Sequence, residues 1–258
     1  MSISCMATAS SSSPTQCPPG VCENARLDLN SIRGLVVSIN QYIHEFLSNA
    51  EARTAVKLRC ISKLRNHKHE YFEFLEQSII SNLYWGVENI EDAVQTSSSE
   101  VRATKLQTAE QMLQVPALLD EHGETSGMDN RYLVCCSYFY LSLVKNLQGD
   151  EWQVALHFLQ SLLVSPRLVL TEFAQEFCYS LLLSFATCSR QENCTSMRSD
   201  SCVEFGEGDF GESTVRQVAR KYKDWLMYYQ VMSYGETRQW QQQGSSSMFS
   251  SEDGSHSL

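Results

Sequence analysis

Apolar residues recur along most of this chain at three- and four-residue intervals, the spacing that places them on one face of an α-helix. The first periodic segment has its apolar positions at Ile32, Leu35, Val36, Ile39, Ile43, Phe46 and Leu47. The second has them at Val56, Leu58, Ile61 and Leu64. The periodic segments lie near 31–48, 50–66, 70–95, 98–115, 131–147, 151–164, 169–187 and 214–234. No segment shows the clear alternation of a β-strand, so the pattern predicts an all-α protein.

One short connection predicts a pair of antiparallel helices. Gly149 stands where a left-handed residue ends a helix, Asp150 can cap the next helix, and Pro166 is expected to close it. Because two or three residues join these helices, they must pack side by side in opposite directions. The pair matches the tetratricopeptide pattern only in part. We therefore expect a helical bundle, or a helix-hairpin array of the TPR or ARM type, of about seven helices.

Capping boxes predict the starts of two other helices. Ser97 to Glu100 precedes the segment near 98–115, and Thr214 to Gln217 precedes the last helix. Pro116 is expected to stop the first of these two helices. The stretch 120–130 contains two glycines and four acids, which is typical of an exposed connection. The segment 169–187 is the most hydrophobic and is expected to be central.

A glycine in the longest apolar stripe indicates close helix packing. Gly86 lies within the segment near 70–95, where glycine costs ~1 kcal/mol relative to alanine. Such a glycine usually marks the approach of a second helix. We expect Trp85 to pack across that crossing; the alternative is that it lines a peptide-binding groove.

Composition divides the chain into one helical domain and two tails. Residues 27–235 form the predicted domain, interrupted by an acidic loop at about 189–213 that is expected to be flexible. Residues 1–26 are rich in Ser, Thr and Pro, and residues 236–258 are rich in Gln and Ser. Both tails are predicted to be disordered.

Charge and hydropathy narrow the possible locations and partners. The net charge of −10 disfavours nucleic acid as the main partner, because phosphate binding needs clustered Lys and Arg. No apolar run reaches the length of a membrane span. The N-terminal tail lacks the basic start and apolar centre of a secretory signal, and the arginine usual in plastid transit peptides first appears at Arg26. A cytoplasmic or nuclear location is therefore expected, with plastid targeting less favoured.

We find no residue set for catalysis, cofactor binding or metal binding. The ten cysteines include no CxxC pair and are expected to be reduced structural thiols. No nucleophile elbow or P-loop is present, and the GxGxxG-like glycines from Gly206 to Gly211 follow no strand and stand among acids. The prediction is therefore no catalytic residue, no cofactor and no metal, with the oligomeric state left open.

Two groups of side chains are candidates for contact with partners. The segment 52–69 contains six basic residues and no acid: Arg53, Lys57, Arg59, Lys63, Arg65 and Lys68. This basic segment either docks an acidic peptide, an anionic lipid or a nucleic acid, or is a solvated face balanced by acids elsewhere. Trp85 and the aromatic residues of the last helix, Trp225 and Tyr228, form the second group.

Four motifs give the sequence a recognisable family resemblance. They are Asn82–Glu88 continuing through Ile90–Ala93, Ala109–Val115, Asn130–Leu133, and Ala219–Tyr222. In this order they resemble the N-terminal region of plant LIN/CERBERUS proteins, which are U-box and WD40-repeat E3 ubiquitin ligases. The resemblance extends over roughly 27–232 and implies a non-catalytic interaction module, because the ligase activity of that family belongs to its U-box.

The resemblance leaves three hypotheses for function. The chain is a scaffold whose protein partners belong to the ubiquitin pathway, or it is a partial product of a complete U-box ligase. The third hypothesis, independent of the resemblance, is binding of an anionic lipid or nucleic acid through the basic segment. No U-box and no repeats of WD40 length occur in these 258 residues.

Overall fold

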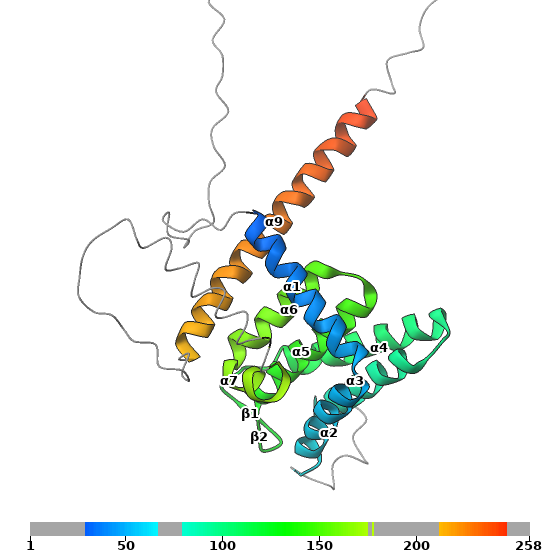
Figure 1. Ribbon diagram of the computed structural model, residues 1–258, viewed down its shortest axis with the longest axis vertical. Helices are drawn as coiled ribbons and strands as arrows, with labels where there is room; N and C mark the ends of the chain where they lie inside the picture. The colour runs from blue at the N-terminus through cyan, green and yellow to red at the C-terminus, as the bar shows by residue number, and fades with distance from the viewer. Residues whose placement is uncertain (1–28, 67–78, 175–176, 178–211, 247–258) are drawn as a thin grey trace, which may run out of the picture.

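The computed structural model describes residues 29–66, 79–174, 177 and 212–246 (Figure 1). Several sequence predictions lie wholly or mostly outside these residues: the tail 1–26, the start of the helix near 70–95, most of the helix near 169–187, and nearly all of the acidic loop. The description below applies to the remaining residues.

Nearly all described elements are helical, which confirms the predicted fold class. The elements are α1 (Leu29–Ser48), α2 (Ala50–Asn66), α3 (Ile79–Gln95), α4 (Ser99–Ala117), β1 (Glu124–Thr125), β2 (Met128–Asp129), α5 (Asn130–Gln148), α6 (Glu151–Val164), α7 (Pro166–Leu168), the π-helical turn η1 (Val169–Phe173) and α9 (Glu212–Ser246).

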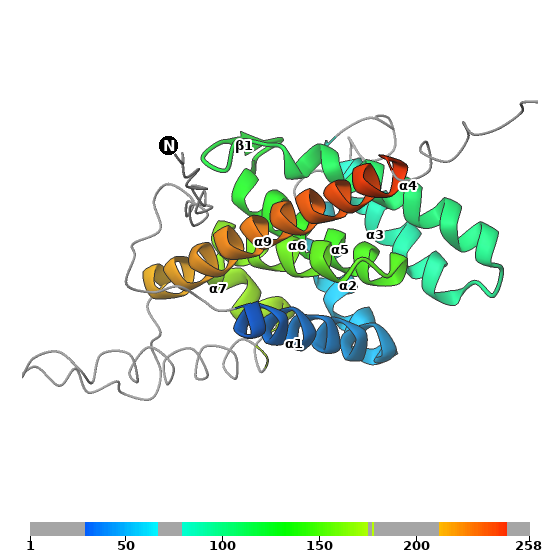
Figure 2. The same cartoon turned by 90° about the horizontal axis from the view of Figure 1, so that it is seen from above.

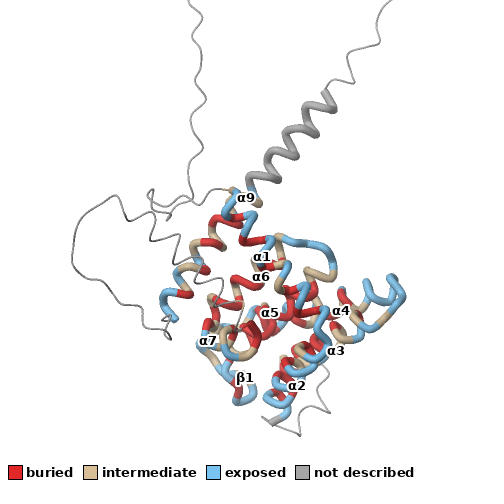
Figure 3. The backbone as a smooth tube through the Cα atoms, in the orientation of Figure 1, coloured by how far each residue is buried: buried red, intermediate tan, exposed pale blue. Residues whose placement is uncertain are grey.

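The helices pack as successive hairpins around α5. Helix α3 pairs with α4, α4 contacts α5, α5 pairs with α6, and both α1 and α9 lie against α6 (Figures 1 and 2). The α3–α4 hairpin projects from one end of the body. Buried positions concentrate in α5 and the helices beside it (Figure 3). Among the described residues the central helix is thus α5; most of the segment 169–187, which hydrophobicity favoured, lies outside them.

Helices α1 and α2 show how well apolar spacing predicts burial. All seven apolar positions expected for α1 are buried. In α2, Val56, Ile61 and Leu64 are buried, but the side chain of Leu58 is 57% exposed. The prediction for Leu58 was therefore wrong, because helical spacing does not reveal how far a neighbouring helix extends across a face.

The α5–α6 hairpin forms as predicted. Gly149 adopts a left-handed φ of +79°, and its amide N–H donates to the Asn146 carbonyl at 3.0 Å. The Asp150 carboxylate accepts a hydrogen bond from the Gln153 amide and caps α6. A residue with a Cβ would be strained at this φ, so the glycine permits the tight reversal.

The α3–α4 crossing depends on Gly86. A Cβ placed on Gly86 would lie 2.7 Å from Leu113 Cγ and 3.6 Å from the Ala109 carbonyl oxygen. The expected close approach is therefore present. Trp85, however, is 48% exposed and lies outside the crossing, because the neighbouring position on a helix is rotated by about 100°.

The ends of α4 differ from the predicted signals. Ser98 is the N-cap and accepts from the Val101 amide at 3.4 Å, so Glu100 occupies the second helical position rather than the third that a capping box requires. Pro116 lies inside the last turn, and α4 continues to Ala117. A proline in a final turn removes one backbone hydrogen bond without blocking a further turn.

The connection between α4 and α5 is more ordered than its composition suggested. It contains a two-stranded hairpin in which Thr125 pairs with Met128, and Met128 is buried. The positive φ values of Ser126 and Gly127 form the turn. The side chain of Asn130 anchors the connection, because it donates to the Asp120 carbonyl at 2.8 Å and accepts from the Thr125 hydroxyl at 2.6 Å. Strands this short leave no detectable alternation in sequence.

Pro166 closes α6 as predicted, but no straight helix follows it. The segment 166–173 is bent by 111° from α6, and residues 169–173 form a wider π-helical turn. At Ala174 the backbone leaves helical geometry, with φ −143°. The apolar run near residue 169 therefore begins with a break, which apolar periodicity does not register.

Helix α9 is longer than predicted at both ends. It begins at Glu212, ahead of the expected capping box at Thr214, and continues to Ser246, beyond the predicted end near Tyr234. Its second half extends past the other described helices in Figure 1. Residues 236–243 are mostly Glu, Gln, Arg and Trp, which tolerate helix well, so Gly235 alone does not end it.

A polar cluster links α4, α5 and α6 beside the core. Lys145 donates to Glu110 at 2.7 Å, and Gln148 donates to the other oxygen of Glu110 at 2.9 Å. His157 stacks on the ring of Tyr138 with 5.9 Å between centroids. Burial, together with the nearby charge of Lys145, lowers the pKa of His157 to about 4, although Glu110 and Asp150 partly oppose this.

We expect Gly86→Leu to lower the free energy of unfolding by about 1–3 kcal/mol, because the added side chain would overpack the α3–α4 crossing. Gly34→Ala is the matched control: no atom lies within 4 Å of its added Cβ, so this change should stabilise α1 by up to about 1 kcal/mol. Urea unfolding of both variants measures the difference. Equal stability of Gly86→Leu and wild type would contradict the close approach.

We also expect His157 to make the fold less stable in acid. Its folded pKa of about 4 lies below the ordinary histidine pKa of 6.5, so the unfolded chain binds the proton first as the pH falls. This group's contribution is fully present above pH 6.5 and should decrease by about 2 kcal/mol between pH 7.5 and pH 5. His157→Phe keeps an aromatic ring but cannot titrate. The unfolding curves of this variant should depend less on pH; an unchanged dependence would exclude His157 as the cause.

Candidate interaction site

The described part of the basic segment, residues 52–66, lies along α2, and Arg53 is the most buried of the basic residues described there. The Arg53 guanidinium Nη1 donates to the Leu47 carbonyl at the end of α1. Its Nε lies 3.4 Å from Glu91 on α3, an ion pair without an aligned hydrogen bond. With a side chain only 9% exposed, Arg53 joins three helices and is poorly placed to meet a partner.

Lys57 and Lys63 are also paired with acids. Lys57 donates to Glu88 on α3 at 2.7 Å, with both side chains about three-quarters buried. Lys63 forms an ion pair with Glu172 in η1, and its ammonium nitrogen lies 4.8 Å from the centre of the Tyr132 ring. These contacts reduce the positive charge that α2 presents to solvent.

Arg59 and Arg65 differ from the other three cations. Arg59 Nη2 donates to the backbone carbonyl of Glu172 at 2.6 Å, and Arg65 Nη2 lies 3.4 Å from the Tyr84 hydroxyl. Among the described residues, neither arginine forms an ion pair with a carboxylate. Lys68 lies outside those residues. The basic segment is therefore not one continuous docking face, and Arg59 and Arg65 keep uncompensated charge at its surface.

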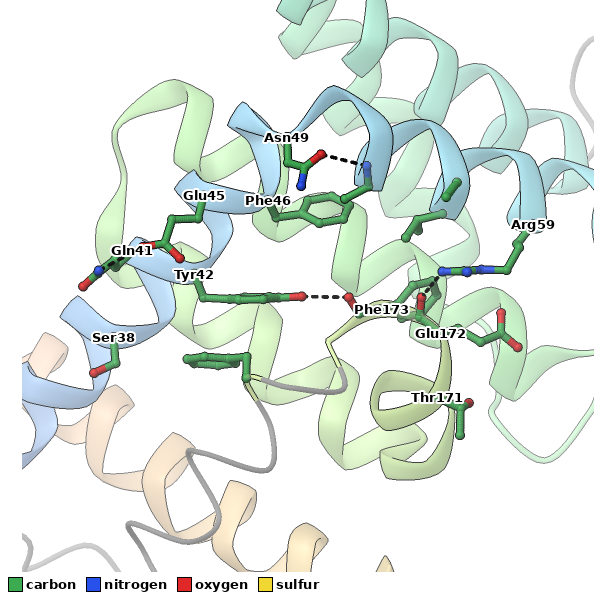
Figure 4. Close-up of a pocket in the computed structure, with 14 residues that line it drawn as sticks. Ser38, Gln41, Tyr42, Glu45, Phe46, Asn49, Arg59, Thr171, Glu172 and Phe173 are labelled. Carbon is green, nitrogen blue, oxygen red and sulfur yellow. Dashed lines mark hydrogen bonds between the residues drawn. The ribbon is translucent and has the colours of Figure 1, made fainter.

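Arg59 lies at the edge of a groove between α1, α2 and η1 (Figure 4). The groove has a volume of about 790 Å³. Its apolar lining comprises Tyr42, Phe46, Ala52, Ala55, Val56, Phe173 and Phe177. Its polar lining comprises Ser38, Gln41, Glu45, Asn49, Arg59, Thr171 and Glu172.

The bend after Pro166 builds one wall of this groove. It brings Phe173 to α1, where the Tyr42 hydroxyl donates to the Phe173 carbonyl at 2.7 Å. The ring of Phe177 stacks on Tyr42 with 4.4 Å between centroids. Sequence reasoning missed the groove, because its walls come from segments more than a hundred residues apart. Pro166 was the one local signal of the bend, and it does not show where the chain goes next.

The aromatic candidates occupy very different environments. Trp85 is 48% exposed, and its ring meets that of Tyr84 edge-on at 5.0 Å between centroids. Trp225 is 2% exposed and belongs to the core, where it stacks with Tyr229. Tyr228 is half-buried and meets Trp225 edge-on. Trp225 is therefore not available to a partner, because α9 presents that face to α6.

The buried thiols have little chemical reactivity. Cys60, Cys135 and Cys136 are buried and free, as expected for structural cysteines. Burial raises the pKa of Cys135 and of Cys136, which keeps both in the unreactive thiol form. Within the described ranges, no three His, Cys, Asp or Glu side chains are grouped as metal ligands.

Within the described ranges, no single helix is long and apolar enough to cross a membrane. Helix α6 and the segment 166–173 together have the length and apolar composition of a membrane span, but they are sharply bent relative to one another.

The described residues form helical hairpins that pack around a buried helix and carry an open groove on their surface. This architecture is that of a helical-repeat protein. A profile of the family described as "E3 ubiquitin-protein ligase LIN-like, ARM repeat" matches residues 30–188. The match covers more than half of the chain and runs from α1 past η1. The chain therefore belongs to the LIN-like ARM-repeat family, which confirms the resemblance found in the sequence over residues 30–188; the motif Ala219–Tyr222 lies outside that match.

Three legume proteins illustrate the relationship. The chain is 32% identical over 157 residues to a Medicago truncatula protein named "Putative E3 ubiquitin-protein ligase LIN". It is 31% identical to each of two Lotus japonicus proteins named "Putative E3 ubiquitin-protein ligase LIN-1" and "LIN-2". Each match covers 59% of this chain but only 11% of the relative. No solved structure matches the chain.

We expect Arg53→Met to lower the free energy of unfolding by roughly 3 kcal/mol, because it leaves the largely buried Glu91 carboxylate without its partner. Arg65→Met is the matched control on the same helix and should change stability by less than about 1 kcal/mol, since its contacts are exposed. Chemical denaturation of both variants tests this. If the two variants are equally stable, Arg53 does not have the structural role described above.

Proposed function

We propose that this chain is a protein-interaction module that acts in ubiquitination-linked assembly. One observation carries the proposal: the LIN-like ARM-repeat profile matches the packed hairpins themselves, from α1 past η1. Stacked helical hairpins offer wide rigid surfaces and grooves, which suit them to binding other proteins. The names of the relatives supply the ubiquitin context.

The proposal assigns no ligase chemistry to these residues. The matched region is about a tenth of each relative, so any catalytic portion of those proteins has ample length elsewhere. The chain then acts by itself as a scaffold, or as one part of a longer ligase. In either case its helices would position partners rather than transfer ubiquitin, in the cytoplasm or nucleus.

Binding of an anionic lipid or nucleic acid receives less support. That alternative needs the cations of α2 to act together on one surface. Arg53, Lys57 and Lys63 instead face Glu91, Glu88 and Glu172. We therefore do not advance it as a second function.

Proximity labelling tests the cellular part of the proposal. The full chain fused to a biotin ligase should enrich ubiquitin-conjugating enzymes, ubiquitin ligases or their substrates. The free biotin ligase and a fusion carrying the destabilising Gly86→Leu change are the controls. Enrichment equal to that of the controls would contradict the assembly role.

A reconstituted ubiquitination reaction tests whether the chain lacks ubiquitin ligase activity. The purified chain, mixed with activating enzyme, conjugating enzymes and ubiquitin, should not accelerate release of ubiquitin from the conjugating enzyme. Acceleration that survives repurification of the chain would show that these residues carry ligase activity after all.

A further inference from the structure

We propose that the groove between α1, α2 and η1 docks a short peptide segment of a partner protein, one that carries an aromatic or branched aliphatic side chain next to a carboxylate. The proposal deepens the interaction role and rests on it. It assigns the groove a ligand chemistry through its apolar floor and through Arg59.

The floor of the groove has room for one large apolar side chain. Its walls are the rings of Tyr42, Phe46 and Phe173, whereas the apolar side chains that α2 contributes, Ala52, Ala55 and Val56, are smaller. The groove exists because small side chains lie between these large rings and leave the space between them unfilled. An aromatic or branched side chain placed there would exchange water for contact with ring faces.

The charge of Arg59 determines the second feature of the proposed peptide, its carboxylate. Glu172 could have neutralised Arg59, but its carboxylate pairs with Lys63 and only its backbone carbonyl accepts from Arg59. The Arg59 guanidinium therefore stands exposed at the rim with further N–H donors and no carboxylate partner among the described residues. A carboxylate of the peptide would supply that partner, in the fork geometry that arginine favours.

The opposite rim limits the orientation of the peptide. Glu45 and Gln41 lie on α1 at the other end of the view in Figure 4, joined by a hydrogen bond of 3.0 Å. The groove is therefore positive at the Arg59 end and negative at the Glu45 end. A peptide would place its acid toward Arg59, and a second acid near Glu45 would be repelled.

The shape of the surface favours a peptide over a compact small molecule. Leu58 lies one turn beyond Ala55 on α2, and its side chain is 57% exposed. The apolar surface thus continues out of the groove along α2. An extended ligand can use both Leu58 and the floor, which a compact ligand confined to the groove cannot.

Selection from a random twelve-residue peptide library on the full-length chain tests the proposal. Enriched peptides should pair an aromatic or branched residue with Asp or Glu. Binding of such a peptide, measured by fluorescence anisotropy, should weaken about tenfold or more in Arg59→Glu, because that change replaces a charge-assisted contact with repulsion. Arg65→Glu is the matched control and should bind like wild type.

Ala55→Trp provides a second variant. Ala55 is exposed, so a larger residue should be tolerated there, but it would occupy the groove and abolish peptide binding. Circular dichroism and thermal melting of each variant establish that it is folded. Repeating the selection on Arg59→Glu should enrich Lys or Arg in place of the acid.

Three outcomes would overturn the groove assignment. In the first, the library yields no binding peptide. In the second, the enriched peptides bind Arg59→Glu and Ala55→Trp as tightly as wild type. In the third, light scattering shows that Ala55→Trp changes the oligomeric state, which would make a second copy of the chain the occupant of the groove. Each leaves the broader interaction role standing if proximity labelling still enriches ubiquitin-pathway proteins. If the enriched peptides bind the groove as expected but proximity labelling enriches no ubiquitin-pathway protein, only the link to ubiquitination would be lost.

Discussion

Burial of α5 is the constraint on which the rest of the structure depends. Twelve of its residues are buried, on every side of the helix, so no single neighbour can cover it. Helices α4 and α6 cover it along two sides, α3 and α1 make further contacts with it, and Phe173 of η1 stacks on Phe139. Each of these neighbours turns an apolar stripe toward α5, while α6 is itself covered by α1 and α9, and α4 by α3.

The same burial holds the groove in shape. Phe139 of α5 stacks on Phe173 with 4.4 Å between centroids, and so fixes the turn whose backbone accepts from Tyr42 and Arg59. The wall of the groove is thus attached to the core rather than to a surface loop. A groove of this kind keeps its form without a ligand, and binding then costs little ordering of the protein.

Sequence reasoning succeeded where one local cause sets the structure. Apolar spacing identified every buried residue of α1, and Gly149 with Asp150 located the α5–α6 reversal, because helical faces and caps are decided within a few residues. It failed where tertiary neighbours decide. The exposure of Leu58 and Trp85, the burial of Trp225 and the pairing of Arg53 each depend on a helix far away in sequence. The groove belongs to this second kind, since residue chemistry alone does not show that η1 returns to Tyr42.

The pairing of charges gives the predicted basic segment a different meaning. Read along the chain, six cations without an acid are typical of a surface for polyanions. In three dimensions Glu88, Glu91 and Glu172 turn three of them into links between helices, so half of that charge supports the fold. Arg59 is left beside an apolar hollow, where one uncompensated charge can select a ligand more sharply than a diffuse patch. Helix α9 lies beyond the matched family region and contributes no lining residue to this groove. The groove therefore lies within the part of the chain that matches the LIN-like family, and core side chains such as Phe46 and Phe173 form part of its lining.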